Sequence, residues 1–143
     1  MNFLDTIQNH IANLFAAKIE VHMEKEVFTF ASKKGVFPLK TCVFLKRDRR
    51  AFKIVSFGIE GTKAIAHKKI ELFSKNSKSD YECLKQFIKY GLSLTTNKHA
   101  FIRPSITCKG LENFSEFFSG YEHGIFLNLF IEAGALDVDF ITS

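Results

Sequence analysis

The strongest constraint on the fold of this chain is a change in its hydrophobic period after residue 58. Between residues 18 and 58, short apolar runs are separated by turns, which predicts four strands in an antiparallel meander. Helical and extended patterns then alternate, with a helix over 81–92, a strand over 105–108, a helix ending near Ile131 and a strand over 136–141. Because helix-connected strands pair in parallel, we predict an α/β fold (mixed α+β) in which the meander and the later strands share one mixed sheet.

Turn-forming residues mark the boundaries within the meander. Residues 24–26 and 32–35 separate its first three strands. The third strand is predicted over 36–45, and the charged segment 46–50 forms the hairpin loop that follows it. Pro38 lies early in this third strand, and proline is tolerated only at the start of a strand or at a sheet edge.

Glycines predict two of the later element ends. Gly58 ends the fourth strand, 52–57, and Gly134 provides a left-handed stop for the last helix. Between them, we predict a short helix over 61–67 and a polar linker over 74–80. The linker does not separate two cores, so the sequence predicts a single domain.

The first 17 residues predict an amphipathic helix. Its apolar residues recur one, three or four positions apart, as on one face of a helix. They are Phe3, Leu4, Ile7, Ile11, Leu14 and Phe15. The polar face has no Lys or Arg before Lys18, which favours packing on the chain's own domain over a lipid anchor. A membrane surface and a partner protein stay open as alternative contacts for this helix.

Length, charge and cysteine content limit the classes of function. The 143 residues are enough for one domain with its own core, and the net charge of +5 permits contact with anionic lipid or nucleic acid without requiring either. Cys42, Cys83 and Cys108 form no metal or redox motif, so we expect reduced thiols. The five histidines lack the spacing of a metal site. We expect a cytoplasmic protein, with the inner face of the membrane as a possible location.

A basic cluster in the predicted hairpin loop is the strongest surface candidate. It consists of Lys46, Arg47, Arg49 and Arg50. A charge run of this kind is usually a solvated hairpin tip, and its functional alternative is contact with phosphates or with a partner protein. Nucleic acid is the less favoured partner, because base stacking requires exposed aromatic residues and the Phe residues here follow a core-like alternation.

Taken in order along the chain, these segments resemble the N-terminal part of the bacterial actin-like MreB family. Residues 19–30, IEVHMEKEVFTF, are similar to the first hairpin of the family, IDLGTANTLVYV. Residues 84–89, LKQFIK, and 103–108, RPSITC, are similar to a helix and a strand of the family. Weaker similarities are found at Leu14–Phe15, Pro38 with 43–45, 55–63, Glu122, 133–135 and 138–141.

The resemblance implies an actin-like (ribonuclease H-like) half-domain over residues 1–143, divided into a helix over 1–17, a meander over 18–58 and an α/β part over 59–143. Family members bind ATP and Mg²⁺. The resemblance places Glu20, His22 and Met23 at the first phosphate loop, where the family has Asp, Gly and Thr. A side chain at the glycine position obstructs the approach of a phosphate.

The resemblance also implies that the catalytic machinery is incomplete. The family has a catalytic Glu after the strand that ends here at Ile141, and Thr142 and Ser143 stand in its place. The second phosphate loop and the adenosine-binding domain of the family would follow residue 143. We therefore expect a truncated domain that is not an enzyme and that needs no cofactor.

These observations favour a non-catalytic MreB-like domain of the bacterial actin-like cytoskeleton. We expect it to act in cell-shape determination through protein–protein contact, with actin-like filament subunits or another protein as partners. Two alternatives remain at this stage. One is a small basic adaptor at an anionic membrane surface, and the other is a gene remnant without function.

Overall fold

The computed structural model describes residues 18–49, 51–58, 68–74, 81–96 and 103–142. Its first five elements are the strands β1 (Lys18–Met23), β2 (Val27–Ser32), β3 (Gly35–Lys40), β4 (Cys42–Asp48) and β5 (Ala51–Phe57). The later ones are β6 (Lys68–Glu71), α2 (Tyr81–Thr95), β7 (Ser105–Lys109), the 3-10 helix η2 (Leu111–Phe114), α3 (Glu122–Glu132) and β8 (Asp137–Ile141). The described elements follow the predicted order, except that the predicted third strand is divided into β3 and β4 and that β6 and η2 are additional.

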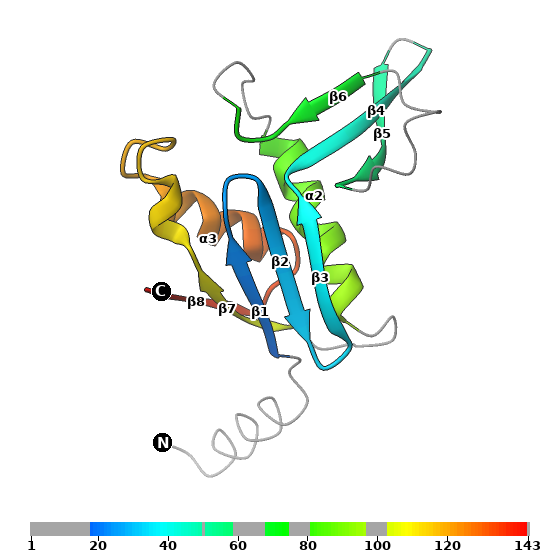
Figure 1. Ribbon diagram of the computed structural model, residues 1–143. Coiled ribbons are helices and arrows are strands. Elements are labelled where there is room, and N and C mark those ends of the chain that lie inside the picture. The colour runs from blue at the N-terminus through cyan, green and yellow to red at the C-terminus, as the bar shows by residue number, and fades with distance from the viewer. Residues whose placement is uncertain (1–17, 50, 59–67, 75–80, 97–102, 143) are drawn as a thin grey trace, which may run out of the picture.

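The larger sheet has five strands in the order β3-β2-β1-β7-β8 (Figure 1). Strands β1, β2 and β3 pair antiparallel, whereas β1, β7 and β8 pair in parallel. Helix α2 contacts β2 and β3, α3 contacts β8, and both helices lie on the same side of this sheet. The predicted α/β class with a mixed sheet is confirmed. Pro38 lies in β3, which is an edge strand as its proline indicates.

The prediction that the whole meander joins one sheet is wrong in one respect. The predicted third strand divides at Thr41, and its second half belongs to a separate three-stranded antiparallel sheet, β5-β4-β6. The backbone N–H of Thr41 donates to the carbonyl of Glu26 at 3.0 Å, and its carbonyl accepts from the N–H of Leu72 at 2.9 Å. These non-local bonds occupy the Thr41 backbone, so β3 and β4 cannot continue as one regular strand.

Glycines confirm two predicted boundaries. Strand β5 ends at Phe57, and the following Gly58 has φ +59°. A Cβ atom on Gly58 would lie 2.6 Å from the carbonyl oxygen of Lys40, so the junction of the two sheets requires glycine there. Helix α3 ends at Glu132, and Gly134 has φ +114°, the positive φ predicted for the helix stop.

The core is an aromatic cluster between the larger sheet and its helices. The ring of Phe28 in β2 lies 5.6–6.2 Å, between centroids, from rings of four other elements or loops. These partners are Phe73 after β6, Phe87 in α2, Phe114 in η2 and Phe126 in α3. Because one strand residue contacts elements from so many parts of the sequence, the cluster fixes the helices on the sheet.

The three cysteines are buried and form no disulfide with one another, as the sequence predicts. Burial raises the pKa of the Cys42 thiol and raises the pKa of Cys108 to about 12. Both thiols are therefore protonated at neutral pH, which is the behaviour of structural cysteines. Within the described ranges, no helix is both long and apolar enough to cross a membrane.

Several predicted segments lie outside the described residues. They are the amphipathic helix over 1–17 with its stripe of Phe3, Leu4, Ile7, Ile11, Leu14 and Phe15, the short helix over 61–67, most of the linker over 74–80, and Arg50.

Candidate functional site

The first candidate site is the turn between β1 and β2, where the resemblance places a phosphate loop. The carboxyl ends of the parallel strands β1, β7 and β8 lie at the same end of the larger sheet, and this turn follows the carboxyl end of β1. Ligands of open α/β sheets commonly bind outside the carboxyl ends of parallel strands. Glu24, Lys25 and Glu26 are exposed in the turn, which the N–H of Glu24 closes by donating to the carbonyl of Val27 at 2.9 Å.

The three predicted phosphate-loop residues precede this turn and do not form one group. Glu20, His22 and Met23 all belong to β1, in which successive side chains alternate between the two faces of the sheet. Glu20 and His22 are exposed on the face opposite the helices, and Met23 is fully buried in the core. Lys109 Nζ of the neighbouring strand lies 4.0 Å from a carboxylate oxygen of Glu20.

The loop after β7 fits closely against the end of β1. Asn113 Nδ2 donates to the carbonyl oxygen of Met23 at 2.9 Å. Gly110 has φ +94°, and a Cβ atom at this position would lie 2.1 Å from the same carbonyl oxygen. Gly110 follows directly after the last residue of β7. Its contact with a residue 87 positions earlier follows from the parallel pairing of β1 and β7, which no local signal reports.

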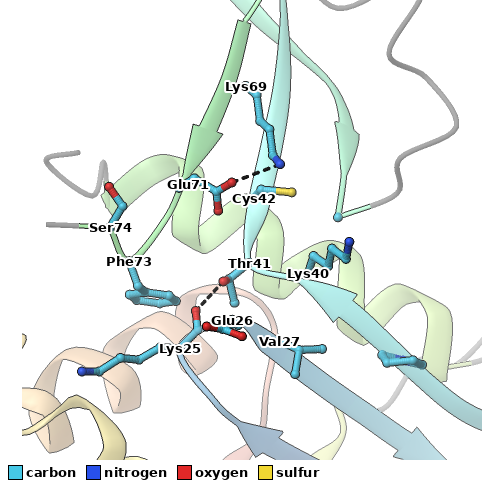
Figure 2. Close-up of a pocket in the computed structure, with 12 residues that line it drawn as sticks. Lys25, Glu26, Val27, Lys40, Thr41, Cys42, Lys69, Glu71, Phe73 and Ser74 are labelled. Carbon is cyan, nitrogen blue, oxygen red and sulfur yellow. Dashed lines mark hydrogen bonds and ion pairs between the residues drawn. The ribbon is translucent and has the colours of Figure 1, made fainter. Parts of the chain in front are cut away.

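The second candidate site is a cleft of about 820 Å³ at the junction of the two sheets (Figure 2). Twelve residues line it: Lys25, Glu26, Val27, Pro38, Lys40, Thr41, Cys42, Gly58, Lys69, Glu71, Phe73 and Ser74. The Thr41 hydroxyl donates to the carbonyl oxygen of Lys25, and Lys69 Nζ lies 3.0 Å from Glu71 Oε1. Cations and carboxylates therefore lie side by side in the cleft. Backbone atoms of the β1–β2 turn form part of its wall.

This cleft was not predicted from the sequence. It exists because the chain turns at Thr41 and because β6 brings Lys69 and Glu71 beside β4. Burial is the main cause of the raised pKa of Cys42, and Lys69 lowers that pKa by a smaller amount. The thiol in the cleft is therefore not activated as a nucleophile. Among the residues that the structure describes, no group of His, Cys, Asp and Glu could hold a metal ion.

The basic cluster lies on the smaller sheet. Lys46 and Arg47 are exposed at the end of β4, and Arg49 lies in the turn to β5 with φ +57°. The register of the hairpin places Lys46 directly opposite Lys53 of β5. The structure thus brings together three of the four predicted cluster residues and adds Lys53 to them.

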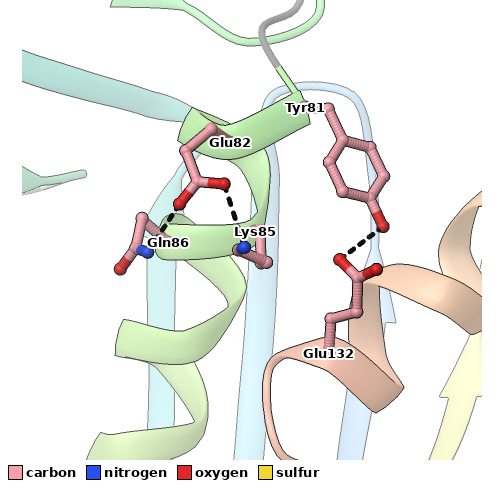
Figure 3. A network of polar contacts seen from close by, with 5 residues as sticks. All are labelled: Tyr81, Glu82, Lys85, Gln86 and Glu132. Atoms are coloured by element: carbon pink, nitrogen blue, oxygen red, sulfur yellow. Dashed lines mark hydrogen bonds and ion pairs between the residues drawn. The ribbon is translucent and has the colours of Figure 1, made fainter.

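Polar contacts on the helical layer have a structural role (Figure 3). The Tyr81 hydroxyl donates to Glu132 Oε2 at 2.9 Å and so joins the start of α2 to the end of α3. Partial burial, together with this hydrogen bond, raises the pKa of Tyr81 to about 12. On α2 itself, Glu82 pairs with Lys85 at 2.9 Å and accepts from Gln86 at 3.0 Å. The Tyr81–Glu132 hydrogen bond links the two helices, and the contacts of Glu82 lie within α2.

Comparison with known proteins identifies the architecture. No protein-family model matches the chain, and no curated protein matches it. Two solved structures resemble it with TM-scores of 0.57: a non-polymerising A278D mutant of MamK bound to AMPPNP, and MreB 5 of Spiroplasma citri bound to AMPPNP. The sequence identities are 14% and 12%. The matches cover 89% of this chain but only 41% and 38% of those proteins. The chain therefore has the fold of part of a bacterial actin-like protein, as its resemblance to the MreB family implies.

Proposed function

We propose that this chain is a non-catalytic actin-like domain that acts by contact with subunits of a bacterial actin-like filament. In this role it takes part in the cytoskeleton that determines cell shape, in the cytoplasm and at the inner face of the membrane. The observation that carries the proposal is the combination of an actin-like fold with an altered β1–β2 turn.

The geometry of this turn supports the loss of nucleotide chemistry. Both structural neighbours are described as bound to AMPPNP, an ATP analogue. Here Glu24 and Glu26 place two exposed carboxylates at the tip of the turn, and each repels a phosphate. His22 stands where the family has its glycine, and the Met23 side chain is used in the core. These residues do not fit a phosphate cradle.

Contact with a partner is the role that such a domain retains. One structural neighbour, MamK, is described as a non-polymerising mutant. In this chain, the larger sheet keeps one face free of helices within the described residues. A domain that pairs with one end of a filament subunit, without supplying the next interface, would limit filament growth.

Co-sedimentation tests this proposal. Polymerised MreB 5 of Spiroplasma citri is mixed with the chain and centrifuged, with the chain alone at the same concentration as control. We expect the chain to enter the pellet only when polymer is present, and we expect the filaments to become shorter as the chain is added. A chain that stays in the supernatant and leaves filament length unchanged would rule out this contact.

A second candidate function is that of a basic adaptor at an anionic membrane. The basic cluster on the smaller sheet, where Lys46 lies directly opposite Lys53, favours it.

A further inference from the structure

Negative charge is concentrated at the C-terminal end of the sequence. Residues 110–143 contain six acidic residues and no Lys or Arg, whereas the first 109 residues contain all 20 Lys and Arg of the chain and nine acidic residues. The described part of this acidic segment forms η2, α3 and β8, and α3 contacts both η2 and β8. Its acidic residues are therefore gathered in one continuous part of the fold. They are Glu112, Glu116, Glu122, Glu132, Asp137 and Asp139.

Strand β8, within this acidic segment, lies at an open edge of the larger sheet (Figure 1). Among the described residues it pairs only with β7, so every second residue of β8 directs its backbone N–H and C=O away from β7. The opposite edge strand, β3, contains Pro38, which has no N–H to donate to a further strand. Strand β8 contains no proline, so its backbone is the better suited of the two to accept another strand.

The apolar side chains of β8 are incompletely covered. Val138 and Phe140 pair with Ile106 and Cys108 of β7 and share their side of the sheet, which faces the helices. Ile106 and Cys108 are 2% and 0% exposed, whereas Val138 and Phe140 are only half-buried, although both pack against the core. The difference arises because β7 has a strand on each side, and the described residues place a strand on one side of β8. A further strand at this edge would cover Val138 and Phe140 with its own apolar side chains.

The charged side chains of β8 lie on the other face of the sheet. Asp137 and Asp139 are exposed there, and no described residue forms an ion pair or a hydrogen bond with either carboxylate. Cross-strand pairs of opposite charge stabilise a sheet, and like charges directly opposite each other destabilise it. A strand that pairs with β8 is therefore favoured when the residues opposite Asp137 and Asp139 are Lys or Arg.

Exposed apolar residues accompany the carboxylates of the acidic segment. Among the described residues, five large apolar side chains are exposed, and three of them, Tyr121, Ile131 and Leu136, belong to this segment. Leu136 directly precedes β8 and is 47% exposed. A surface that combines carboxylates with apolar side chains favours a basic partner that also has apolar residues, and its charge repels nucleic acid and anionic lipid.

We propose that the edge of β8 binds an extended basic segment of a partner protein as an additional strand. This segment carries Lys or Arg at alternate positions, opposite Asp137 and Asp139, and apolar residues between them, opposite Val138 and Phe140. Main-chain hydrogen bonds to the open edge supply affinity, and the alternate side chains supply specificity. The inference goes beyond the proposed filament contact and does not rest on it, so its failure leaves that contact untouched.

The described edge strands of a second copy do not supply such a segment. Strands β3 and β5 contain one basic residue each, and β8 contains none. Strand β6 contains Lys68 and Lys69, which are adjacent and therefore point to opposite faces. None of these strands carries two basic residues on one face, which favours a different protein as the partner.

Fluorescence anisotropy with a synthetic peptide tests the inference. The probe is the labelled peptide Gly-Lys-Val-Lys-Val-Lys-Gly, and the control peptide Gly-Val-Lys-Lys-Lys-Val-Gly has the same composition without the alternation. We expect the full chain to bind the alternating peptide about tenfold more tightly, because only this peptide places all its lysines on one face of a strand and its valines on the other. Equal affinities for the two peptides would leave net charge as the cause of binding and would overturn the inference.

Two N-methylated forms of the alternating peptide test for strand pairing. Methylation of either the valines or the lysines removes the N–H groups along one edge of the extended peptide. Since only one edge faces β8, one form should lose about tenfold or more in affinity, and the other should stay within about threefold of the unmodified peptide. Full binding by both forms would show that the peptide does not bind as a strand.

A charge reversal on β8 locates the site. In Asp139→Lys, affinity for the alternating peptide should fall about tenfold, because the change removes one attraction and adds one repulsion. Glu116→Lys makes the same change in net charge in the loop before α3 and should weaken binding no more than about twofold. Asp139 is exposed at a sheet edge, so its variant should melt within about 2 °C of the wild type. If Asp139→Lys does not fold, Asp137→Lys replaces it, with the same expected loss.

The inference fails if the wild type binds neither peptide, or if Glu116→Lys weakens binding as much as Asp139→Lys. Light scattering of the chain alone gives a further check, and we expect the mass of a monomer. A dimer that Asp139→Lys dissociates would make a second copy the occupant of the β8 edge and would also overturn the inference.

Discussion

Replacing Gly110 with alanine is expected to lower the free energy of unfolding by about 3 kcal/mol or more, since two independent costs add. The first cost is steric, because the new Cβ atom would lie 2.1 Å from the carbonyl oxygen of Met23, which is backbone and cannot rotate away. The second is conformational, because φ +94° is rarely adopted by residues other than glycine. For a domain of this size, a fall of about 10 °C in melting temperature corresponds to this loss.

Gly120→Ala is the matched control for this prediction. Gly120 has φ +89°, and no heavy atom of the described residues lies within 4 Å of the point that a Cβ atom would occupy there. It therefore carries the conformational cost without the clash, which we expect to amount to about 1–2 kcal/mol. Chemical denaturation of both variants measures the difference. Equal losses would show that the loop after β7 does not lie against the end of β1.

Replacing Phe28 with alanine is expected to cost about 4 kcal/mol, the usual range for a buried phenylalanine. Phe28 is fully buried, and its ring packs against the rings of Phe73, Phe87, Phe114 and Phe126. The cavity would be lined by residues from both helices, which cannot all move inward together. Urea denaturation, with tertiary structure followed by near-ultraviolet circular dichroism, measures the loss.

Phe37→Ala is the control for the aromatic core. Phe37 is a half-buried residue of the edge strand β3, so the same substitution should cost less than half as much. A gene remnant with a loose interior would respond similarly to both changes and would unfold without a cooperative transition. That outcome would contradict both the packed core and any function that depends on it.

The sequence predicts the local elements well where a pattern of period two or 3.6 is uninterrupted. Strands β1, β2, β7 and β8 and helices α2 and α3 follow from such patterns. The division of the third strand does not, since the apolar residues continue through Cys42 and Val43 and the bonds that separate β3 from β4 come from Glu26 and Leu72. Strand β6 was missed because Lys68–Glu71 is short and polar, and pairing with β4 alone makes it extended.

The candidate site shows the same limit. The resemblance places Glu20, His22 and Met23 together at a phosphate loop. In the structure, the alternation of side chains along β1 puts Met23 on the opposite face of the sheet from the other two. The cleft depends on which distant segments pair, as the pairing of Lys69 with the β4 strand shows. Charge clustering near Lys46 was visible in the sequence, whereas the facing pair with Lys53 required the hairpin register.

A calorimetric titration decides whether an actin-like fold persists here without nucleotide chemistry. The purified chain is titrated with AMPPNP in the presence of Mg²⁺, with the AMPPNP-binding MreB 5 of Spiroplasma citri as positive control. We predict no saturable binding heat, because Glu24 and Glu26 repel the phosphates. We also predict that the same preparation unfolds cooperatively on heating, which shows that the titrated chain is folded. Saturable binding at micromolar concentrations of nucleotide would contradict the loss of nucleotide chemistry.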